Sequence, residues 1–258
     1  MIKEIIFKGI HFKNYGKNEI DKLFDKNGLI VLPSGPGLSS INKDKIYVQA
    51  LKNSDQVLLD SGYFVLLLKI IKNISVKKIS GYLFFKHLIK HLQKNKFKKL
   101  LSIDPNKSLS KKNNNFFLKK GLNKKKIIHY IAPRYNSFKL IDLDLLKLIK
   151  KNKPDYIVIN IGGGVQEVLG YYLKRNFNNK LKIYCTGAAI SYYTGDQAPL
   201  SKFIDNYYLG WFIRIFYSPS LLFRYIKAFK LLLIIKNSKI IIKNYLNLIY
   251  VKFWIYLN

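Results

Sequence analysis

Short apolar segments alternate with longer amphipathic segments along most of this chain. Six apolar segments have the length and the Ile, Val, Leu or Tyr content of strands: 28–32, 57–59, 99–103, 127–131, 156–161 and 181–184. Between them, the spacing of apolar residues predicts helices at 40–53, 62–73, 82–95, 110–121, 141–152 and 165–175. This alternation predicts a Rossmann-like α/β domain, with a largely parallel sheet flanked by helices. The ligand site of such a sheet lies at the carboxyl ends of its strands.

The charge of the chain is strongly positive. The 258 residues carry a formal net charge of +32, and 49% of them are hydrophobic, so the chain can bury a core and is not a disordered polycation. Such an excess of positive charge indicates an anionic partner, which is a nucleic acid, an anionic membrane surface or a phosphorylated substrate. The alternative is the coding bias of an AT-rich genome, which also enriches Lys, Asn, Ile and Tyr.

Features of export and membrane insertion are missing from the pattern. Cys185 is the single cysteine, so no internal disulfide forms, which fits a reducing compartment. Residues 1–14 lack the apolar core and the cleavage site of a signal peptide. No segment reaches the roughly 18 uncharged apolar residues of a spanning helix. We therefore expect a cytoplasmic protein.

The composition changes after Asp205, which divides the chain into an α/β domain at 1–205 and a C-terminal segment at 206–258. The second segment has no Asp or Glu, and its lysines and arginines are interleaved with apolar and aromatic residues. This composition is typical of helices that lie on an anionic membrane surface. The alternative is a basic helix pair packed on the edge of the sheet.

Arginine is rare in this chain, which makes its positions informative. Only four of the 46 basic residues are arginines, and Arg214 and Arg224 both lie in the C-terminal segment, near Trp211. A guanidinium group is a planar fork of donors that binds a diphosphate or a carboxylate at two points, as lysine cannot. The pair therefore suggests an anionic ligand.

The first candidate site residue is Asp60. It follows the apolar strand 57–59 directly and precedes Ser61 and Gly62, at the start of a predicted helix. At the carboxyl end of a parallel strand, a carboxylate faces the crevice and can act as a general base or bind a sugar hydroxyl. The alternative is that Asp60 caps the helix that follows.

The second candidate is the turn Gly162-Gly163-Gly164, which joins a strand to a helix. Glycines let a ligand approach the backbone, and the first N–H groups of the helix favour an anion. The residues that follow match neither the dinucleotide-binding pattern nor a P-loop. Gln166 and Glu167 open the helix, and Glu167 would repel a phosphate, so we expect it to bind a sugar hydroxyl or an arginine. The alternative is a plain turn with a helix-start glutamate.

Two more strand ends offer small or polar residues. Gly187 and Ala188 follow the strand that ends near Cys185, and small residues there suit the floor of a crevice. Ser34 and Gly35 follow the strand 28–32, although the surrounding Pro-Ser-Gly-Pro-Gly is no nucleophile elbow.

Other motifs favour structural roles. Asp142 and Asp144 form an Asp-x-Asp, but they lie at the start of an amphipathic helix, where acids stabilise the helix dipole. His87 and His91 lie four residues apart without a third metal ligand, which predicts a solvated helix face. Cys185 has no nearby base and is expected to be a buried small residue. We expect no metal site and no cofactor.

In this order, these sites resemble the WecG/TagA/CpsF family of bacterial glycosyltransferases, glycosyltransferase family 26, over roughly residues 28–230. The family's Asp-Gly strand end and Gly-x-Pro-Lys-Gln-Glu are similar to Asp60-Ser61-Gly62 and to residues 162–167. Towards its C-terminus the family pattern has a small-residue turn, an Ala-Pro, a Leu-Glu-Trp and then Arg, Pro and Arg. The similar residues of this chain, in the same order, are Gly187-Ala188-Ala189, Ala198-Pro199, Leu209-Gly210-Trp211, Arg214, Pro219 and Arg224.

The sequence departs from the family pattern at several of these positions. The Thr-x-Asn after the early strand reads Pro33-Ser34-Gly35, and the Pro-Lys before Gln-Glu reads Gly164-Val165. At three further positions, Ser191 replaces the family's Asp, Gly210 replaces its Glu, and Gly81-Tyr82-Leu83 replaces its Gly-x-Asp.

The resemblance implies an inverting transferase of envelope or exopolysaccharide synthesis. Such an enzyme moves a hexose, often N-acetylmannosamine-like, from a UDP-sugar to a polyprenyl-diphosphate-linked acceptor, on the inner face of the cytoplasmic membrane. Asp60 would be the base, and Ser34 and Gly35 would contact the acceptor. The donor would be bound without a metal by these residues: Gly162, Gly163, Gly164, Gln166, Glu167, Gly187, Ala188, Arg214 and Arg224. Segment 206–258 would close the donor site and contact the membrane.

Two alternatives from other classes stay open. The departures allow a catalytically inactive relative that acts as a membrane-bound assembly partner. The charge allows a nucleic-acid-binding protein, although no RNA-recognition motif, zinc knuckle or helix-turn-helix is present, so nucleic acid is the less favoured partner. The oligomeric state, including a homo-oligomer, is left open.

Overall fold

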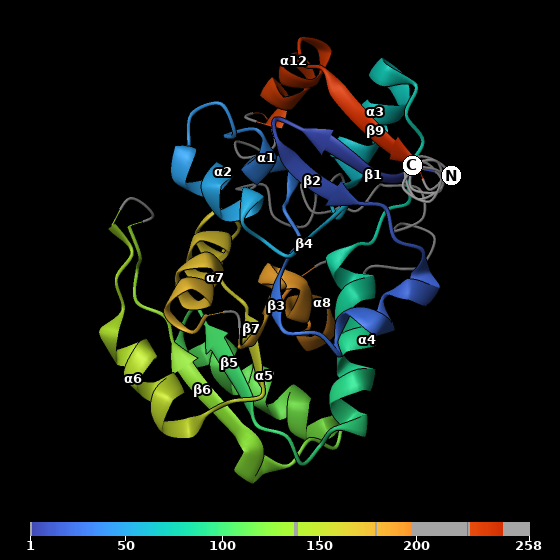
Figure 1. The fold of residues 1–258 in the computed structure, drawn as a ribbon. Coiled ribbons are helices and arrows are strands. Elements are labelled where there is room, and N and C mark those ends of the chain that lie inside the picture. The colour runs from blue at the N-terminus through green and yellow to red at the C-terminus, as the bar shows by residue number, and fades with distance from the viewer. Residues whose placement is uncertain (1, 137–138, 179, 198–225, 227, 245–258) are drawn as a thin grey trace, which may run out of the picture.

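The computed structural model describes residues 2–136, 139–178, 180–197, 226 and 228–244. Within these residues, nine strands form one sheet in the order β6-β5-β7-β8-β3-β4-β2-β1-β9 (Figure 1). The strands from β6 to β2 run parallel to one another. They are β2 (Ile10–Lys13), β3 (Gly28–Val31), β4 (Gln56–Leu58), β5 (Leu100–Asp104), β6 (Ile127–Ile131), β7 (Tyr156–Ile159) and β8 (Lys182–Cys185). All six expected strands are present, and the α/β prediction is confirmed.

Three strands that the sequence pattern did not predict, β1, β2 and β9, extend the sheet at one end. β1 (Ile2–Phe7) forms an antiparallel hairpin with β2, and β9 (Ile240–Asn244) pairs antiparallel with the other edge of β1. Glu4 of β1 is 5% exposed and holds the three strands together, because it contacts Lys13 of β2 and lies 3.1 Å from Lys243 of β9.

The six expected helices are present, with shifted ends. They are α2 (Lys45–Lys52), α3 (Gly62–Lys72), α4 (Gly81–Lys94), α5 (Lys107–Lys119), α6 (Leu143–Asn152) and α7 (Val165–Asn176). The largest difference is at α2, which begins five residues later than expected because the side chain of Asp44 caps it and accepts the N–H of Tyr47 at 2.9 Å. Short helices add to these: α1 (Gly35–Leu38), α8 (Ser191–Thr194), α12 (Lys230–Lys236) and the 3-10 turns 17–19, 21–23, 124–126 and 187–190.

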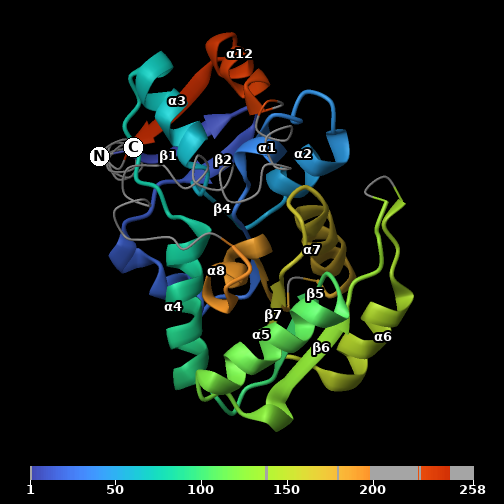
Figure 2. The ribbon, with the colours of Figure 1, turned by 180° about the vertical axis from the view of Figure 1, so that it is seen from behind.

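Helices cover both faces of the sheet (Figures 1 and 2). One apolar core contains buried residues of α2, α3, α6, α7 and α12, and the other contains those of α4 and α5. Strand residues alternate between them, so Leu29 and Val31 belong to the first core and Ile30 and Leu32 to the second. Burial on both faces explains why the central strands are continuously apolar.

Candidate active site

Four neighbouring strands end at the same edge of the sheet. β7, β8, β3 and β4 are adjacent and parallel, so the turns that follow them lie side by side. From β3 the chain continues to β4, which lies on one side of β3, whereas β8, β7 and β5 lie on the other side of β3. Such a reversal of strand order is where open α/β sheets bind their ligands.

Asp60 follows β4 and is half-buried at this edge. Its Oδ1 accepts the N–H of Gly81, the first residue of α4, at 2.6 Å. It does not cap α3 as the alternative interpretation had it, because Ser61 is the N-cap and its Oγ accepts the N–H of Phe64 at 3.2 Å. The amino end of α4 therefore stabilises the charged carboxylate.

Gly81 brings the amino end of α4 close to the turn after β8. A β-carbon built on Gly81 would lie 3.3 Å from the side chain of Ala189 and 3.9 Å from the carbonyl oxygen of Thr186. The close approach therefore explains glycine at this position. It also places Asp60 beside the turn that contains Gly187 and Ala188.

The described residues leave one side of the glycine turn uncovered. Among the described residues, a β-carbon built on Gly162 or Gly164 would meet no atom within 4 Å, whereas one on Gly163 would lie 3.2 Å from Oγ of Ser34. Gly164 has φ of +94°, which side chains rarely adopt. As far as the described residues show, the turn therefore leaves space on the side away from Ser34.

Glu167 closes this turn from within the protein. It is fully buried, its Oε2 accepts the N–H of Gly164 at 2.6 Å, and its Oε1 accepts from Nε2 of Gln166 at 3.1 Å. Burial is the main reason that the pKa of Glu167 is raised to about 7; hydrogen bonds to the carboxylate partly oppose the rise, and the negative charge of Asp60 adds to it. The carboxylate is thus engaged by its own turn.

Gln166 is the polar side chain between the turns after β7 and β8. It is 3% exposed, and its Oε1 has no hydrogen-bond partner among the described residues. A β-carbon built on Gly187 would lie 3.3 Å from Nε2 of Gln166. Gly187 also has φ of +55°. Two glycine-containing turns therefore meet at one buried amide, while Ala188 is exposed beside them.

Ser34 and Gly35 join the same cluster from the end of β3. Ser34 caps α1 and accepts the N–H of Gly37 at 3.3 Å. A β-carbon built on Gly35 would lie 3.0 Å from Oγ of Ser61, beside Asp60. Arg214, Arg224 and Trp211 lie outside the described residues.

A family model for "Glycosyl transferase WecG/TagA/CpsF family" matches residues 6–244. The chain belongs to the WecG/TagA/CpsF glycosyltransferase family. No curated protein matches it. Membership in this family implies a glycosyltransferase role in the synthesis of cell-envelope polymers.

One departure from the pattern of the WecG/TagA/CpsF family has a geometric consequence. Gly164 stands where the family typically has proline, yet proline fixes φ near −65° and cannot adopt the +94° observed here. Val165, beside it, supplies no positive charge where a lysine is typical. The backbone of this turn therefore follows a different path from one that contains proline.

The structure also places the remaining candidates, and one of them, Cys185, is the last residue of β8, at this same edge of the sheet. Asp142 caps α6 and accepts the N–H of Leu145 at 2.8 Å, as expected. His91 is half-buried, its ring centroid lies 5.2 Å from that of Phe24, and its Nε2 lies 3.0 Å from the hydroxyl of Tyr156, so the expected solvated face is wrong for this histidine. Cys185 is fully buried, as expected.

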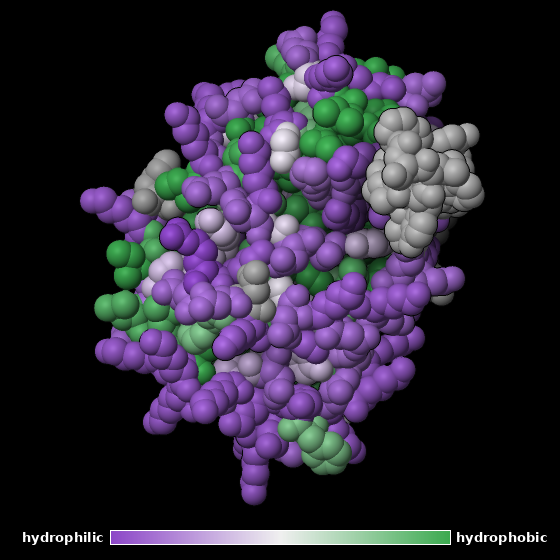
Figure 3. All heavy atoms as spheres, viewed as in Figure 1, coloured by the Kyte–Doolittle hydropathy of each residue, from purple (hydrophilic) through white to green (hydrophobic). Residues whose placement is uncertain are grey.

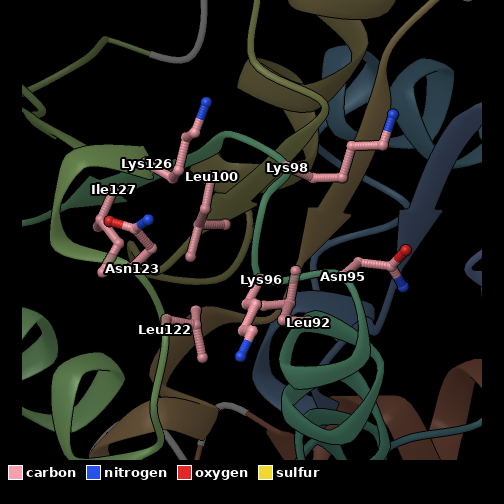
Figure 4. A pocket seen from close by; sticks show the side chains of 9 residues that line it. All are labelled: Leu92, Asn95, Lys96, Lys98, Leu100, Leu122, Asn123, Lys126 and Ile127. Atoms are coloured by element: carbon pink, nitrogen blue, oxygen red, sulfur yellow. The ribbon is translucent and has the colours of Figure 1, made fainter.

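A pocket at the opposite end of the strands does not belong to the candidate site. It is lined by residues near the starts of β5 and β6, including Lys96, Lys98 and Lys126, whose ammonium groups point in different directions (Figure 4). In the described part of the chain, no three His, Cys, Asp or Glu residues are grouped as metal ligands. Among the described helices, none combines the length and apolarity needed to cross a bilayer.

Sequence reasoning missed a buried polar network beside the site. Ser102 and Asp104 of β5, Asn160 after β7 and Thr186 after β8 are joined by hydrogen bonds. The available signal was the pair of polar residues two apart in an otherwise apolar strand, since such residues point to the same face.

Proposed function

We propose that this protein transfers a hexose from a UDP-sugar to a polyprenyl-diphosphate-linked acceptor, with inversion at the anomeric carbon and without a metal. The observation that carries the proposal is the position of Asp60. Its carboxylate lies at the carboxyl edge of the sheet, fixed by Gly81, among turns of which the described residues leave one uncovered on one side. Family membership supports a nucleotide-sugar donor and a lipid-linked acceptor.

Asp60 acts as the general base in this proposal. It removes the proton of the acceptor hydroxyl as the oxygen attacks the anomeric carbon, and the bond to UDP breaks on the opposite face of the sugar. Contact with the N–H of Gly81 keeps the carboxylate oriented and charged before the reaction. Ser34 and Gly35, next to Ser61, face the acceptor side.

The leaving UDP gains negative charge as the bond breaks. N–H groups of the turn 162–164 and of the start of α7 favour that charge, and Arg214 and Arg224 would neutralise it by bidentate contacts. Gln166, Gly187 and Ala188 would bind the sugar or the nucleoside. Glu167 supports the donor by holding the turn, because its oxygens are engaged by Gly164 and Gln166.

A membrane-facing surface fits a lipid-linked acceptor. Ile70 of α3 and Phe229 and Leu233 at α12 are each more than half exposed, on two helices that contact each other and carry lysines. Figure 3 shows apolar side chains near the end of the molecule where these elements lie, on a face that is otherwise mostly hydrophilic. We propose that this surface and segment 206–258 hold the protein on the inner face of the cytoplasmic membrane. Sedimentation with anionic vesicles should decrease when Leu233 is replaced by Glu, and unchanged sedimentation would refute the assignment.

The decisive experiment compares Asp60→Asn with wild type in a UDP-release assay. A panel of UDP-sugars is combined with a short polyprenyl-diphosphate-N-acetylglucosamine acceptor in the presence of EDTA. We expect acceptor-dependent release by the wild type and a loss of about 100-fold or more in kcat for Asp60→Asn. The affinity for UDP should be retained, because the substitution removes the base and not the donor contacts.

Asp155→Asn is the matched control, since Asp155 also accepts a backbone N–H, that of Lys99 at 2.7 Å, but directly precedes β7, at the opposite edge of the sheet. Its kcat should stay near that of wild type. Full turnover by Asp60→Asn would refute the role of Asp60. UDP binding with no release from any donor would favour an inactive relative, and salt-dependent RNA binding with no UDP binding would favour a nucleic-acid-binding protein.

A further inference from the structure

A fully buried carboxylate lies beside the candidate site, at the carboxyl end of β5. Oδ1 of Asp104 accepts hydrogen bonds from Ser102 at 2.8 Å, Asn113 of α5 at 2.7 Å and Asn160 at 3.1 Å. Oδ2 lies 2.8 Å from Nδ1 of His129 on β6. Four side chains from four parts of the chain therefore share one acceptor group. A carboxylate suits this position because it accepts at both oxygens.

Asn160 extends this contact toward the crevice. Its amide nitrogen donates to Asp104 and lies 3.0 Å from Oγ of Ser102, while its Oδ1 accepts the hydroxyl of Thr186 at 3.1 Å. Asn160 and Thr186 are each 5% exposed. A continuous chain of hydrogen bonds thus joins the ends of β5, β7 and β8.

Both ends of that chain continue into turns of the candidate site. Asn160 is two residues before Gly162, and Thr186 directly precedes Gly187. The carbonyl oxygen of Thr186 also lies close to Gly81, whose N–H holds Asp60. Any rotation of the Asn160 amide would therefore disturb the spacing of the two turns.

The hydrogen bonds around Asp104 favour its charged form. Burial alone would raise the pKa of Asp104, but the hydrogen bonds from His129 and Asn113 outweigh it and lower the pKa. Removing the carboxylate would leave buried donors unsatisfied, which costs more than the net contribution of the bonds themselves.

We propose that Asp104 is a positioning residue for the donor site, which fixes Asn160 and, through it, Thr186 and the turns 162–164 and 186–189. The inference rests on the proposed function, because that proposal assigns donor binding to these turns. Asp104 touches no substrate in this account; it sets the distance between the backbone groups that do.

The experiment measures amide hydrogen exchange and UDP affinity on the full chain. In Asp104→Ala, exchange within 160–165 and 186–190 should become about tenfold faster, as expected for the loss of a buried hydrogen bond, and UDP affinity should fall by a similar factor. Asn113→Ala is the matched control: it removes one contact to Asp104 and leaves the Asn160–Thr186 link. Its faster exchange should be confined to α5, with UDP affinity unchanged.

Two further variants separate positioning from general destabilisation. Asp104→Asn keeps an acceptor oxygen for Asn160 and can donate to an unprotonated Nδ1 of His129, so it should restore both slow exchange and UDP affinity. Thr186→Val has nearly the same shape and breaks only the last link, so it tests the same path if Asp104→Ala does not fold. Combined with Asp104→Ala, it should add little further loss of affinity, because both act through Asn160.

Unchanged exchange in the two turns of folded Asp104→Ala would overturn the proposal, as would faster exchange with unchanged UDP affinity. If Asp104→Ala does not fold, unchanged exchange and affinity in Thr186→Val would overturn it. If the wild-type protein binds no UDP, the proposed function fails, and the exchange result alone decides whether Asp104 fixes the turns.

Discussion

Glu167→Gln should change how the stability of the protein depends on pH. Glu167 is fully buried, and its pKa rises from the ordinary 4.5 to about 7 in the folded state. The folded protein therefore binds this proton more tightly than the unfolded chain does. The resulting stabilisation is fully present below pH 4.5 and is lost as the pH rises through about 7.

The magnitude follows from the size of that shift. One pKa unit corresponds to about 1.4 kcal/mol, so the whole shift is worth about 3 kcal/mol, of which about 2.5 kcal/mol is lost between pH 5 and pH 8. Glutamine has the same size and is neutral at every pH. The difference in unfolding free energy, wild type minus Glu167→Gln, should therefore fall by about 2.5 kcal/mol from pH 5 to pH 8.

Urea unfolding of both proteins at pH 5 and pH 8 measures this difference. Equal m-values are required, because they show that the variant exposes the same surface on unfolding. All other titrating groups contribute equally to both proteins and cancel. A difference that stays constant within about 1 kcal/mol would mean that Glu167 titrates in the folded protein much as it does in the unfolded chain.

Two further predictions concern the glycine turn and the strands at the end of the sheet. Gly164→Ala should lower the free energy of unfolding by about 1–3 kcal/mol, because a φ of +94° is strained for a residue with a side chain. Gly162→Ala is the control, and its free energy of unfolding should stay within about 0.5 kcal/mol of wild type. Equal losses in the two variants would contradict this reasoning. Burial would raise the pKa of Glu4, but hydrogen bonds from Lys13, His11 and Lys243 lower it to about 2. Glu4 therefore contributes stability above pH 4.5 that is lost as the pH falls toward 2. Glu4→Gln should lower the free energy of unfolding by about 2–3 kcal/mol at pH 7 and by much less at pH 3. Thermal melts of both proteins at the two pH values measure this difference.

The sequence was sufficient for elements whose signal is local. The strand Tyr156–Ile159 is continuously apolar because both faces are covered, and the helix at 62–72 follows from its apolar residues. Asp60 could be placed at a strand end because an apolar strand runs directly into it. Ruling out Asp60 as the cap of α3 needed the structure, because only the hydrogen bonds show that Ser61 caps this helix and that Asp60 contacts α4.

Features that depend on distant partners could not be predicted. The strand at 240–244 is defined by its pairing with Ile2–Phe7, more than 230 residues away in the chain. Burial of Asp104 becomes intelligible only when its donors on α5, β6 and the end of β7 are known. His91 looks like a surface residue from its lysine-rich neighbours, yet aromatic residues from other elements surround it.

The pairing of β1 with β9 has a consequence for synthesis. During translation β1 can pair with β2 at once, but its other edge waits until residues 240–244 have left the ribosome. At about 5–20 residues per second, that interval lasts on the order of 10–50 s. For that time an Ile-rich edge is open to neighbouring nascent chains, and it is a site where aggregation can begin. A nascent chain that is released before residue 240 would keep this edge open permanently, so its recovery should depend on chaperones more than that of the full chain.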